Sequence, residues 1–578
     1  ADAEGNFTIE APAGNYSLEV TAMGYHKFKK KIKLIEGDTI FINPVLSETS
    51  YSINQIVVTG TLKESFVKVS PVKVEVISSA FLKKTPTNNF MEIIETVNGV
   101  QKQINCGVCG TSDIHINGME GPYSLILIDG MPIMSSLSTV YGLNGIPTSL
   151  IKQIEIIKGP SSTLYGTEAV AGVINIITKR PQDISKLEFD SFLSSDMEKN
   201  VDFSWSPKWD KANMLLSANL FHMDHFMDDN GDGFSDEVLS ERISVFNKWA
   251  FHRKSGRIFD FSAKYYFEDR FGGIENWTPE HKGSDSIYGE VIKTNRWELS
   301  SRYGLPSSEN ILWQSSYNYH NQDSYYGDSE YKGTQNTLFN QLLWYKDLGL
   351  RHRLTTGIAY KFNSFNDNTP ATKEIDLTYI PGFFIQDEFA LSDKWKFLSG
   401  IRWDKHQDHG NIFAPRLNLK WTPNANTSFR WNTGTGFRVV NIFTEDHAAL
   451  TGARDIVITN ELQPEESINI DFNLHHWFQR KDHHTSIDLD LFYTHFSNKI
   501  VPDYNTDPTK IIYDNLEGYS ISKGASFQIN QSFSIPLNIS LGGTYLEVYT
   551  INEAEKNIEL FTPSFSGVFS IGYEWPLN

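Results

Sequence analysis

The residues of this 578-residue chain that are best suited to chemistry are two cysteines. Cys106 and Cys109 form a single C-x-x-C, and no other cysteine is present. Two thiolates at this spacing suit a soft metal such as Cu(I) or Zn²⁺, although two ligands alone do not complete a site. In an oxidising compartment the same pair forms a disulfide. We therefore predict a disulfide that braces a loop, with metal binding as the alternative.

A short acidic run has the spacing of a calcium-binding loop. Asp228, Asn230, Asp232 and Asp236 fall at positions 1, 3, 5 and 9 of an EF-hand loop, and Gly233 falls at position 6. Position 12 holds a leucine instead of the usual glutamate, so the match is partial. The sequence indicates either a structural calcium site or a solvated acidic loop.

Histidines also occur in pairs, each of which could line a haem or metal-chelate site or lie solvated in a surface loop. The pairs are His222 with His225, His406 with His409, His475 with His476, and His483 with His484. The chain contains no nucleophile elbow, Walker loop, H-E-x-x-H or dinucleotide fingerprint. We therefore expect a protein that is not an enzyme and that requires no cofactor apart from a possible structural calcium ion.

The composition limits the kinds of molecule and environment with which the protein can interact. The formal net charge is -19, which argues against a nucleic-acid surface. No run of about 18 apolar residues is present, so no transmembrane helix is expected. A search for long apolar runs does not detect a transmembrane β-barrel, because the strands of a barrel alternate between apolar and polar residues. The aromatic content of 13% suits the aromatic girdles of such a barrel or a glycan-binding β-sandwich.

The elements that must position these residues show two different hydrophobic patterns. Residues 113–179 hold three short apolar strands, predicted over Ser124–Asp129, Ile151–Lys158 and Gly172–Lys179. From about Leu187 onward, long segments alternate instead, as in Ser486–Phe492, where aliphatic and acidic side chains take opposite faces. We predict a mostly β protein in which a barrel encloses a compact α/β piece.

The compact piece carries five motifs in order, namely Ile116-Asn117-Gly118, Leu127-Ile128-Asp129-Gly130-Met131-Pro132, Ile154-Glu155-Ile156-Ile157-Lys158-Gly159-Pro160, Tyr165-Gly166 and Gly172-Val173-Ile174-Asn175-Ile176-Ile177-Thr178-Lys179. Their order and spacing resemble the plug signature of TonB-dependent outer-membrane receptors. The resemblance implies a bacterial outer-membrane protein whose antiparallel barrel, surrounded by lipid, has about 22 strands when complete. It also implies active transport driven by a TonB-type energising protein.

The same resemblance divides the chain. Residues 1–48 resemble a carboxypeptidase regulatory-like β-sandwich fragment, with strands expected near Phe7–Ile9, Tyr16–Val20 and Lys31–Leu34. Residues 49–62 contain a segment that resembles the TonB box. We expect this box segment (53–59) to be exposed and to bind its partner by strand addition through Ile53, Gln55, Ile56, Val57, Val58 and Thr59. The plug follows at 63–182 and the barrel at 183–578.

Ligand contacts are expected at the plug apex, because ligands of the family rest there; the candidates are Met119, Glu120, Tyr123, Met131 and Met134. The three methionines would equally suit packing inside the barrel. The resemblance favours a ferric siderophore or other metal chelate, with haem or cobalamin as alternatives. Two further alternatives are a plugged barrel that transports nothing and a partner of a surface lipoprotein that imports glycans or peptides. We also expect segments beyond both ends of this sequence, including C-terminal barrel strands.

Overall fold

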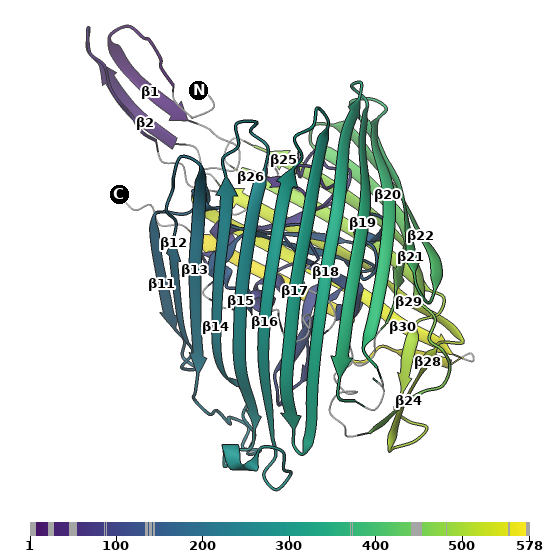
Figure 1. Ribbon diagram of the computed structural model, residues 1–578. Helices are drawn as coiled ribbons and strands as arrows, with labels where there is room; N and C mark the ends of the chain where they lie inside the picture. Colours follow the sequence, from purple (N-terminus) through teal and green to yellow (C-terminus); the bar gives the residue numbers. More distant parts are fainter. Residues whose placement is uncertain are drawn as a thin grey trace.

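The computed structural model describes the chain except for residues 1–6, 21–27, 45–54, 86, 88, 133–136, 138–141, 143–144, 370–371, 373, 441–453, 481–482, 534, 553–554 and 574–578. It has three parts: a large sheet, a smaller α/β domain within it and an N-terminal strand pair outside it (Figure 1). No helix among the described residues has the length and apolar character needed to cross a membrane.

The large sheet contains 19 strands, and consecutive strands along the chain are antiparallel neighbours. They are β11 (Leu187–Leu193), β12 (Lys199–Trp205), β13 (Ala212–Met223), β14 (Leu239–Phe251), β15 (Phe259–Gly273), β16 (Gly289–Gly304), β17 (Asn310–Tyr326), β18 (Ser329–Leu348), β19 (His352–Asp367), β20 (Asp376–Ala390), β21 (Trp395–His406), β22 (Gly410–Asn424), β23 (Thr427–Arg438), β25 (Glu465–Gln479), β26 (His483–Phe496), β29 (Gly518–Phe533), β30 (Leu537–Asn552), β31 (Glu555–Ile558) and β32 (Phe565–Tyr573). Within the described residues, β11 and β32 are the two ends of this sheet.

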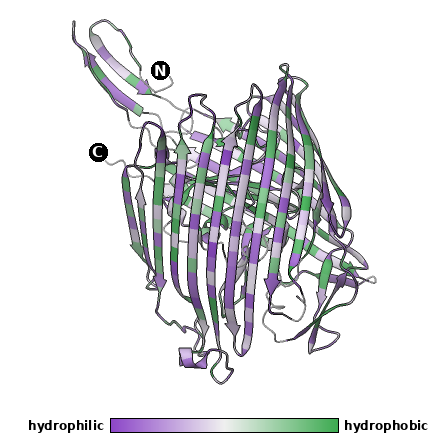
Figure 2. Ribbon diagram, viewed as in Figure 1, coloured by the Kyte–Doolittle hydropathy of each residue, from purple (hydrophilic) through white to green (hydrophobic). Residues whose placement is uncertain are grey.

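Side chains alternate along the barrel strands between a buried inner face and an exposed outer face. In β17, Asn318, His320 and Gln322 are buried, whereas Trp313 and Tyr317 on the other face are exposed. Figure 2 shows the same alternation of apolar and polar residues along neighbouring strands. The polar face therefore points inward and the apolar face outward, the reverse of a protein surrounded by water and the arrangement that lipid requires.

The two ends of the barrel differ. Long connections at 224–238, 274–288, 454–464 and 497–517 lie at one end, which we call the loop end. There, β24 (Asp455–Ile458), β28 (Lys510–Asn515) and β27 (Ile500–Asp503) form a small three-stranded sheet, and η5 (Pro279–His281) lies in another loop. Short connections such as 349–351 and 425–426 lie at the opposite end, the turn end, where the N-terminal strand pair is also found (Figure 1).

The plug is built on a four-stranded sheet in the order β5 (Glu75–Ser78), β9 (Ile151–Lys158), β10 (Gly172–Thr178) and β8 (Ser124–Ile128). The pair β8–β10 is parallel and the other pairs are antiparallel. The three strands predicted from the sequence are thus confirmed, and their β-branched residues, such as Ile154 and Ile174, are fully buried.

Short helices and two strand pairs complete the plug. The helices are α1 (Ser79–Leu82), α2 (Phe90–Ile94), α4 (Ser162–Tyr165), η1 (Gly121–Tyr123), η3 (Thr148–Leu150) and η4 (Pro181–Asp183). The strand pairs are β3 (Ile56–Val57) with β4 (Ser65–Phe66) and β6 (Val100–Cys106) with β7 (Thr111–Ile116). Polar contacts fasten the plug to the barrel wall. Asp129, which follows β8, accepts a 2.7 Å hydrogen bond from Lys248 of β14.

The N-terminal part is simpler than predicted. β1 (Gly14–Val20) and β2 (Phe28–Leu34) form an antiparallel pair outside the barrel (Figure 1). The expected strand at Phe7–Ile9 is not formed, and Ile9 is 67% exposed. Within the described residues, no second sheet covers the pair, so these residues do not by themselves make a sandwich.

Candidate functional site

The box segment is docked on the plug, in contrast to the exposed strand that we predicted. Gln55–Thr59 is described, and Ile53 lies outside the described residues. β3 (Ile56–Val57) pairs with β4, which leaves Ile56 49% exposed, but Val57 and Thr59 are fully buried. The segment therefore keeps only part of its surface available for a partner.

A single carboxylate accounts for this burial. Glu155, in the middle of plug strand β9, accepts hydrogen bonds from the backbone N–H groups of Val58 and Thr59 at 2.9 Å and from the Thr59 hydroxyl at 2.6 Å. Asn175 of β10 donates to the Thr59 hydroxyl, and Tyr165 donates to the Thr59 carbonyl. The box segment is thus joined by hydrogen bonds to the two central strands of the plug.

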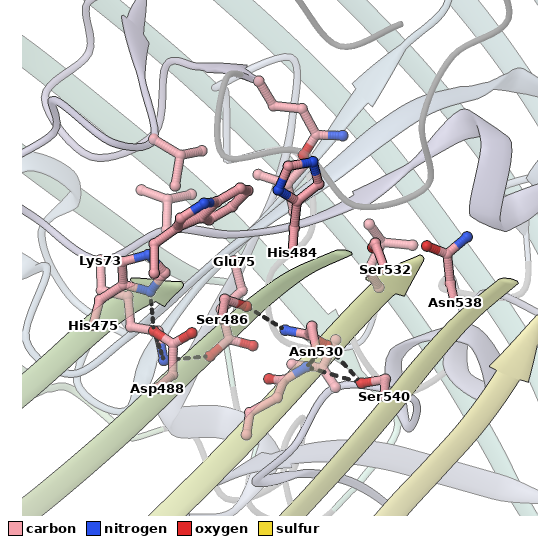
Figure 3. A pocket seen from close by; sticks show the side chains of 18 of the residues that line it. Lys73, Glu75, His475, His484, Ser486, Asp488, Asn530, Ser532, Asn538 and Ser540 are labelled. Atoms are coloured by element: carbon pink, nitrogen blue, oxygen red, sulfur yellow. Dashed lines mark hydrogen bonds and ion pairs between the residues drawn. The ribbon is translucent and has the colours of Figure 1, made fainter. Parts of the chain in front are cut away.

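A cavity of about 650 Å³ lies next to this segment, between the plug and the barrel wall at the turn end. Gln55 lines it from the box segment, and β25, β26, β29 and β30 contribute polar side chains, including His475, Ser486, Asn530 and Ser540 (Figure 3). Ser540 donates to Asn530, which donates to Ser486. The cavity is therefore a partly open space with a mixed lining, because apolar side chains such as Val74, Phe81 and Phe569 also line it.

One lysine of the plug crosses this cavity to the barrel. Lys73 lies 2.6 Å from Asp490, 3.9 Å from Asp488 and 3.2 Å from Glu75 of the plug. Burial lowers the pKa of Lys73, but these three carboxylates outweigh burial and hold the pKa above its ordinary value. The pKa of Glu75 is lowered, because Lys158 and Lys73 outweigh the opposing effect of burial. The plug and barrel are thus held together here by ionised groups.

At the loop end, the predicted apex residues lie mostly inside the plug. Met119, Tyr123 and Met131 are buried in the main plug core, and Met134 lies outside the described residues. The expectation of an exposed methionine surface is therefore wrong for Met119 and Met131, because both side chains fill the core between the plug strands. Packing, the alternative use of these methionines, is what the structure shows.

The remaining two apex residues belong to a charged cluster with the barrel. The hydroxyl of Tyr123 donates to Glu465 at 2.9 Å, and the Arg438 guanidinium lies 4.2 Å from the centre of its ring. The Glu120 carboxylate is 35% exposed and lies 3.1 Å from Lys499. Burial raises the pKa of Glu120, but Lys499 opposes it and brings the pKa to about 2. Of the predicted apex residues that are described, Glu120 is thus the one that reaches solvent.

The predicted disulfide is not formed: Cys106 and Cys109 are both reduced thiols. Each thiol has a different neighbour, because Cys106 Sγ lies 3.4 Å from the Glu290 carboxylate of β16, whereas Cys109 Sγ lies 3.4 Å from the Thr111 hydroxyl. Burial raises the pKa of the Cys109 thiol well above its ordinary value. These two cysteines and Glu290 are the one group of three potential metal ligands found among the described residues.

The acidic loop folds on itself. Asp228 accepts hydrogen bonds from the N–H groups of Gly231, Asp232 and Gly233, and Asp236 accepts from Asp229 N–H and the Asn230 amide. Asn230 and Asp236 are thus joined directly, whereas Asp228 is bonded to the backbone of residues 231–233. Their oxygens point to backbone donors, as in a turn that is also stable without a cation.

The histidine pairs do not converge on one site. His475 and His484 line the cavity at the turn end (Figure 3), and His475 lies 3.1 Å from Asp488. His222 and His406 lie at the loop end, where His222 contacts Asp224 and Glu241 and His406 stacks on His409. His222, His406 and His475 therefore each have a local partner at their own end of the barrel.

Comparison with known families decides what this architecture is. The profile described as "TonB dependent receptor-like, beta-barrel" matches residues 209–578. The chain belongs to the TonB-dependent receptor family. The "TonB-dependent Receptor Plug Domain" profile matches residues 67–173 of the receptor, and a "CarboxypepD_reg-like domain" profile matches residues 1–58. The resemblance found in the sequence is thus confirmed, and it places the receptor in the bacterial outer membrane. The family consists of receptors and transporters, not enzymes.

Relatives of the receptor include proteins named for iron regulation and for vitamin transport. It is 27% identical over 443 residues to the "Iron-regulated outer membrane virulence protein" of Vibrio cholerae, an alignment that covers 72% of this chain and 65% of that protein. The "Vitamin B12 transporter BtuB" of Vibrio cholerae is 22% identical over 487 residues, covering 82% of this chain and 74% of that protein. The chain thus spans about two thirds of the length of the first of these relatives.

Among solved structures, the siderophore receptor PirA from Acinetobacter baumannii matches with a TM-score of 0.69 at 17% sequence identity. The match covers 86% of this chain and 83% of that one. At this identity the comparison establishes the shared fold of the receptor.

Several residues of the site escaped prediction. Glu155 and Asn175 of the receptor were quoted only as parts of motifs, although each is a polar residue within an otherwise apolar strand. That pattern is a usable signal, because a buried polar side chain requires a hydrogen-bond partner. Lys73 and Glu290 carry no such local signal for their contacts between plug and barrel, since Asp490 and Cys106 are more than 180 positions away from them in the chain.

Proposed function

We propose that the receptor imports a metal chelate across the outer membrane, with energy supplied by a TonB-type protein that engages the box segment. The observation that carries this proposal is the attachment of Val58 and Thr59 to Glu155 in plug strand β9. A force applied to the segment would reach the central sheet of the plug directly. A ferric siderophore is the favoured ligand, in keeping with a relative named for iron regulation and a structural neighbour named as a siderophore receptor.

The position of the cavity supports this route. It lies beside Gln55, between the plug and strands β25, β26, β29 and β30, at the end of the barrel to which the box segment belongs. Movement of the plug would extend this space along the inner wall of the barrel.

Deletion of residues 53–59 tests the proposal. We expect uptake of a ferric siderophore to be lost, while binding of the same siderophore at the cell surface is retained. The control is a deletion of equal length at residues 35–41, which form no strand and include the exposed Ile35 and Phe41. Uptake that survives the first deletion would instead favour a plugged barrel that transports nothing.

A second candidate ligand is cobalamin, because one relative is a vitamin B12 transporter. Competition on whole cells distinguishes the two ligands. A siderophore receptor would release labelled ferric siderophore when the unlabelled siderophore is added, and cyanocobalamin at the same concentration would leave it bound. The opposite result would assign the receptor to cobalamin.

We also propose that the acidic loop of Asp228, Asn230, Asp232 and Asp236 takes up a calcium ion. Support comes from the EF-hand spacing of these residues and from the hydrogen bond that the Asn230 amide donates to Asp236 in an exposed turn at the loop end. Extracellular calcium modules bind at about 10⁻⁴–10⁻³ M, so calorimetry should detect an event in that range that Asp228→Asn weakens. Asp408→Asn, in another exposed turn, is the control. An identical calcium response in the two variants would exclude the loop.

A further inference from the structure

Two thiols of the plug and one carboxylate of the barrel converge at the loop end. Cys106 ends β6, Cys109 lies in the turn that follows, and Glu290 lies near the start of β16, 184 positions from Cys106. One ligand atom from each residue lies within 4.8 Å of the other two. Such a spacing is compatible with one ion in contact with all three atoms, given metal–sulfur and metal–oxygen distances of about 2.0–2.3 Å.

The surroundings orient each ligand atom. The backbone N–H of Cys109 points to Cys106 Sγ at 3.2 Å. Tyr288 donates a 2.7 Å hydrogen bond to Glu290 Oε1, which leaves the other oxygen, Oε2, directed at Cys106. Metal ligands are commonly oriented in this way by groups one step removed from the ion.

The turn that carries the thiols is fitted closely to the barrel wall. A Cβ atom at Gly272 of β15 would lie 1.6 Å from the carbonyl oxygen of Val108, so only glycine permits this approach. Arg270, paired with Glu268, donates to the Cys109 carbonyl at 3.2 Å. Strand β15 therefore holds the turn in place through backbone contacts.

An apolar shell surrounds the thiols. Cys109 is fully buried and belongs to a core cluster formed by plug, barrel wall and loops, with Cys106 packed against it. Its other buried members are Leu137, Ile292, Tyr326, Tyr331, Phe365, Ile500, Ile511 and Tyr513. Such a shell limits access of water and so strengthens the attraction between a cation and its ligands.

We propose that Cys106, Cys109 and Glu290 bind a thiophilic divalent cation of the Zn²⁺ class, which links the plug to the barrel wall. Two sulfur donors exclude calcium and magnesium, which require oxygen ligands. The carboxylate favours Zn²⁺ over Cu(I), which prefers sulfur throughout. Three protein ligands leave a fourth tetrahedral position for water or another donor. Each thiol that binds the ion gives up its proton to solvent.

The proposal is independent of the chelate that the receptor transports. Because the ligands come from both plug and barrel, the bound ion would join the two parts at the loop end, opposite the box segment. The ion would therefore oppose displacement of the plug at that end.

Cobalt binding to the purified full chain tests the site. Co²⁺ in place of Zn²⁺ should give one equivalent of bound metal with thiolate-to-cobalt charge-transfer absorption, which added Zn²⁺ removes. Cys106→Ser and Cys109→Ser should each abolish or shift this absorption, whereas Glu290→Gln should keep it at lower affinity. Glu330→Gln, at an exposed acid near the start of β18 at the loop end, is the matched control and should bind as the native chain does.

A separate measurement, hydrogen exchange, tests whether the ion links the plug to the barrel wall. Zn²⁺ should slow hydrogen exchange of residues 106–110 in the native chain and do so less in Glu290→Gln. Tyr288→Phe should weaken metal affinity about 10- to 100-fold, as expected when a group that orients a ligand is removed. Heat-modifiable migration in gels confirms that each variant is folded.

Three results would overturn the proposal. The first is the absence of thiolate-to-cobalt absorption in the native chain. The second is the same absorption and affinity in the native and Cys→Ser chains. The third is a Cys106–Cys109 disulfide, detected by mass mapping of receptor alkylated in intact membranes.

Discussion

At the scale of single residues, one buried carboxylate holds the box segment on the plug. Glu155 is fully buried and accepts three hydrogen bonds from Val58 and Thr59. Hydrogen bonds to a charged group are stronger than those between neutral groups. Glu155 therefore controls how readily the segment becomes available to a partner.

We expect Glu155→Gln to loosen the box segment without unfolding the plug. The amide keeps the shape but loses the charge, which costs about 1.5–3 kcal/mol for a charged hydrogen bond. Hydrogen exchange of residues 55–59 should accelerate accordingly, while exchange in β8 and β10 should be little changed. Glu95→Gln, on the exposed plug surface, serves as the control. Unchanged exchange at 55–59 would show that Glu155 does not hold the segment.

His115 makes the plug sensitive to pH. Its imidazole lies 3.0 Å from Asp113 and is almost buried. Burial lowers the pKa of His115, but Asp113, Glu120 and Glu559 raise it above its ordinary value of 6.5. The charged pair therefore stabilises the plug fully below about pH 6.5, and that stabilisation is lost as pH rises through the higher pKa of the folded state.

Measurement of plug stability at several pH values tests whether stability decreases as pH rises. We expect the unfolding temperature of the native plug to be lower at pH 8.5 than at pH 6. The decrease between these two pH values should be larger in the native chain than in His115→Gln. Calorimetry of both chains gives the difference. A variant with the same pH dependence as the native chain would remove His115 from this role.

At the scale of elements, the barrel strands separate two environments. Leu342 of β18 and Ile358 of β19 pair across the sheet and are 40% and 61% exposed on its outer face. Gln341 and Ala359, their neighbours on the inner face, are buried. The outer face is suited to hydrocarbon and the inner face to the plug.

We expect Ile358→Arg to destabilise the barrel in lipid. A charge on the lipid face costs about 2–4 kcal/mol at the bilayer midplane and less towards its edges. Unfolding in lipid vesicles should therefore require less denaturant for Ile358→Arg, whereas Ile358→Leu should behave as the native chain. Equal stability of both variants would show that position 358 does not face lipid.

At the scale of the whole molecule, polar contacts with the barrel wall hold the plug in place inside the barrel. Asp129 accepts hydrogen bonds from Lys248 of β14 and from the hydroxyl and backbone N–H of Thr178, and both Asp129 and Lys248 are buried. Burial raises the pKa of Asp129, but the attraction of Lys248 and Arg302 holds it at about 2. The Asp129 carboxylate is thus charged throughout the physiological range.

We expect Asp129→Ala to weaken attachment of the plug by about 3–5 kcal/mol, because it leaves the buried Lys248 without its carboxylate. The double variant Asp129→Ala/Lys248→Met should recover part of this loss, which calorimetry of plug unfolding would measure. The contribution of Asp129 should persist above about pH 3.8 and fade as pH falls through about 2. A single variant as stable as the native chain would contradict this account.

The amino-acid sequence by itself determined the family, the plug strands and the alternation of the barrel, because these depend on local periodicity and on turn residues. Strands 124–128, 151–158 and 172–178 could be read from apolar runs bounded by glycines. The reduced state of the thiols, the burial of Met119 and Met131, and the docking of the box segment could not be read in this way.

Only the tertiary structure decided which distant residues meet. Thr59 contacts Glu155 across 96 positions, and Cys106 contacts Glu290 across 184. Local pattern assigns a residue to a face of its strand, but its partner there depends on how the barrel curves around the plug. The two cysteines show the difference. Their spacing in the sequence identified each cysteine only as a partner of the other. The folded chain adds a carboxylate from the barrel wall, which makes the two cysteines candidate ligands of a metal ion.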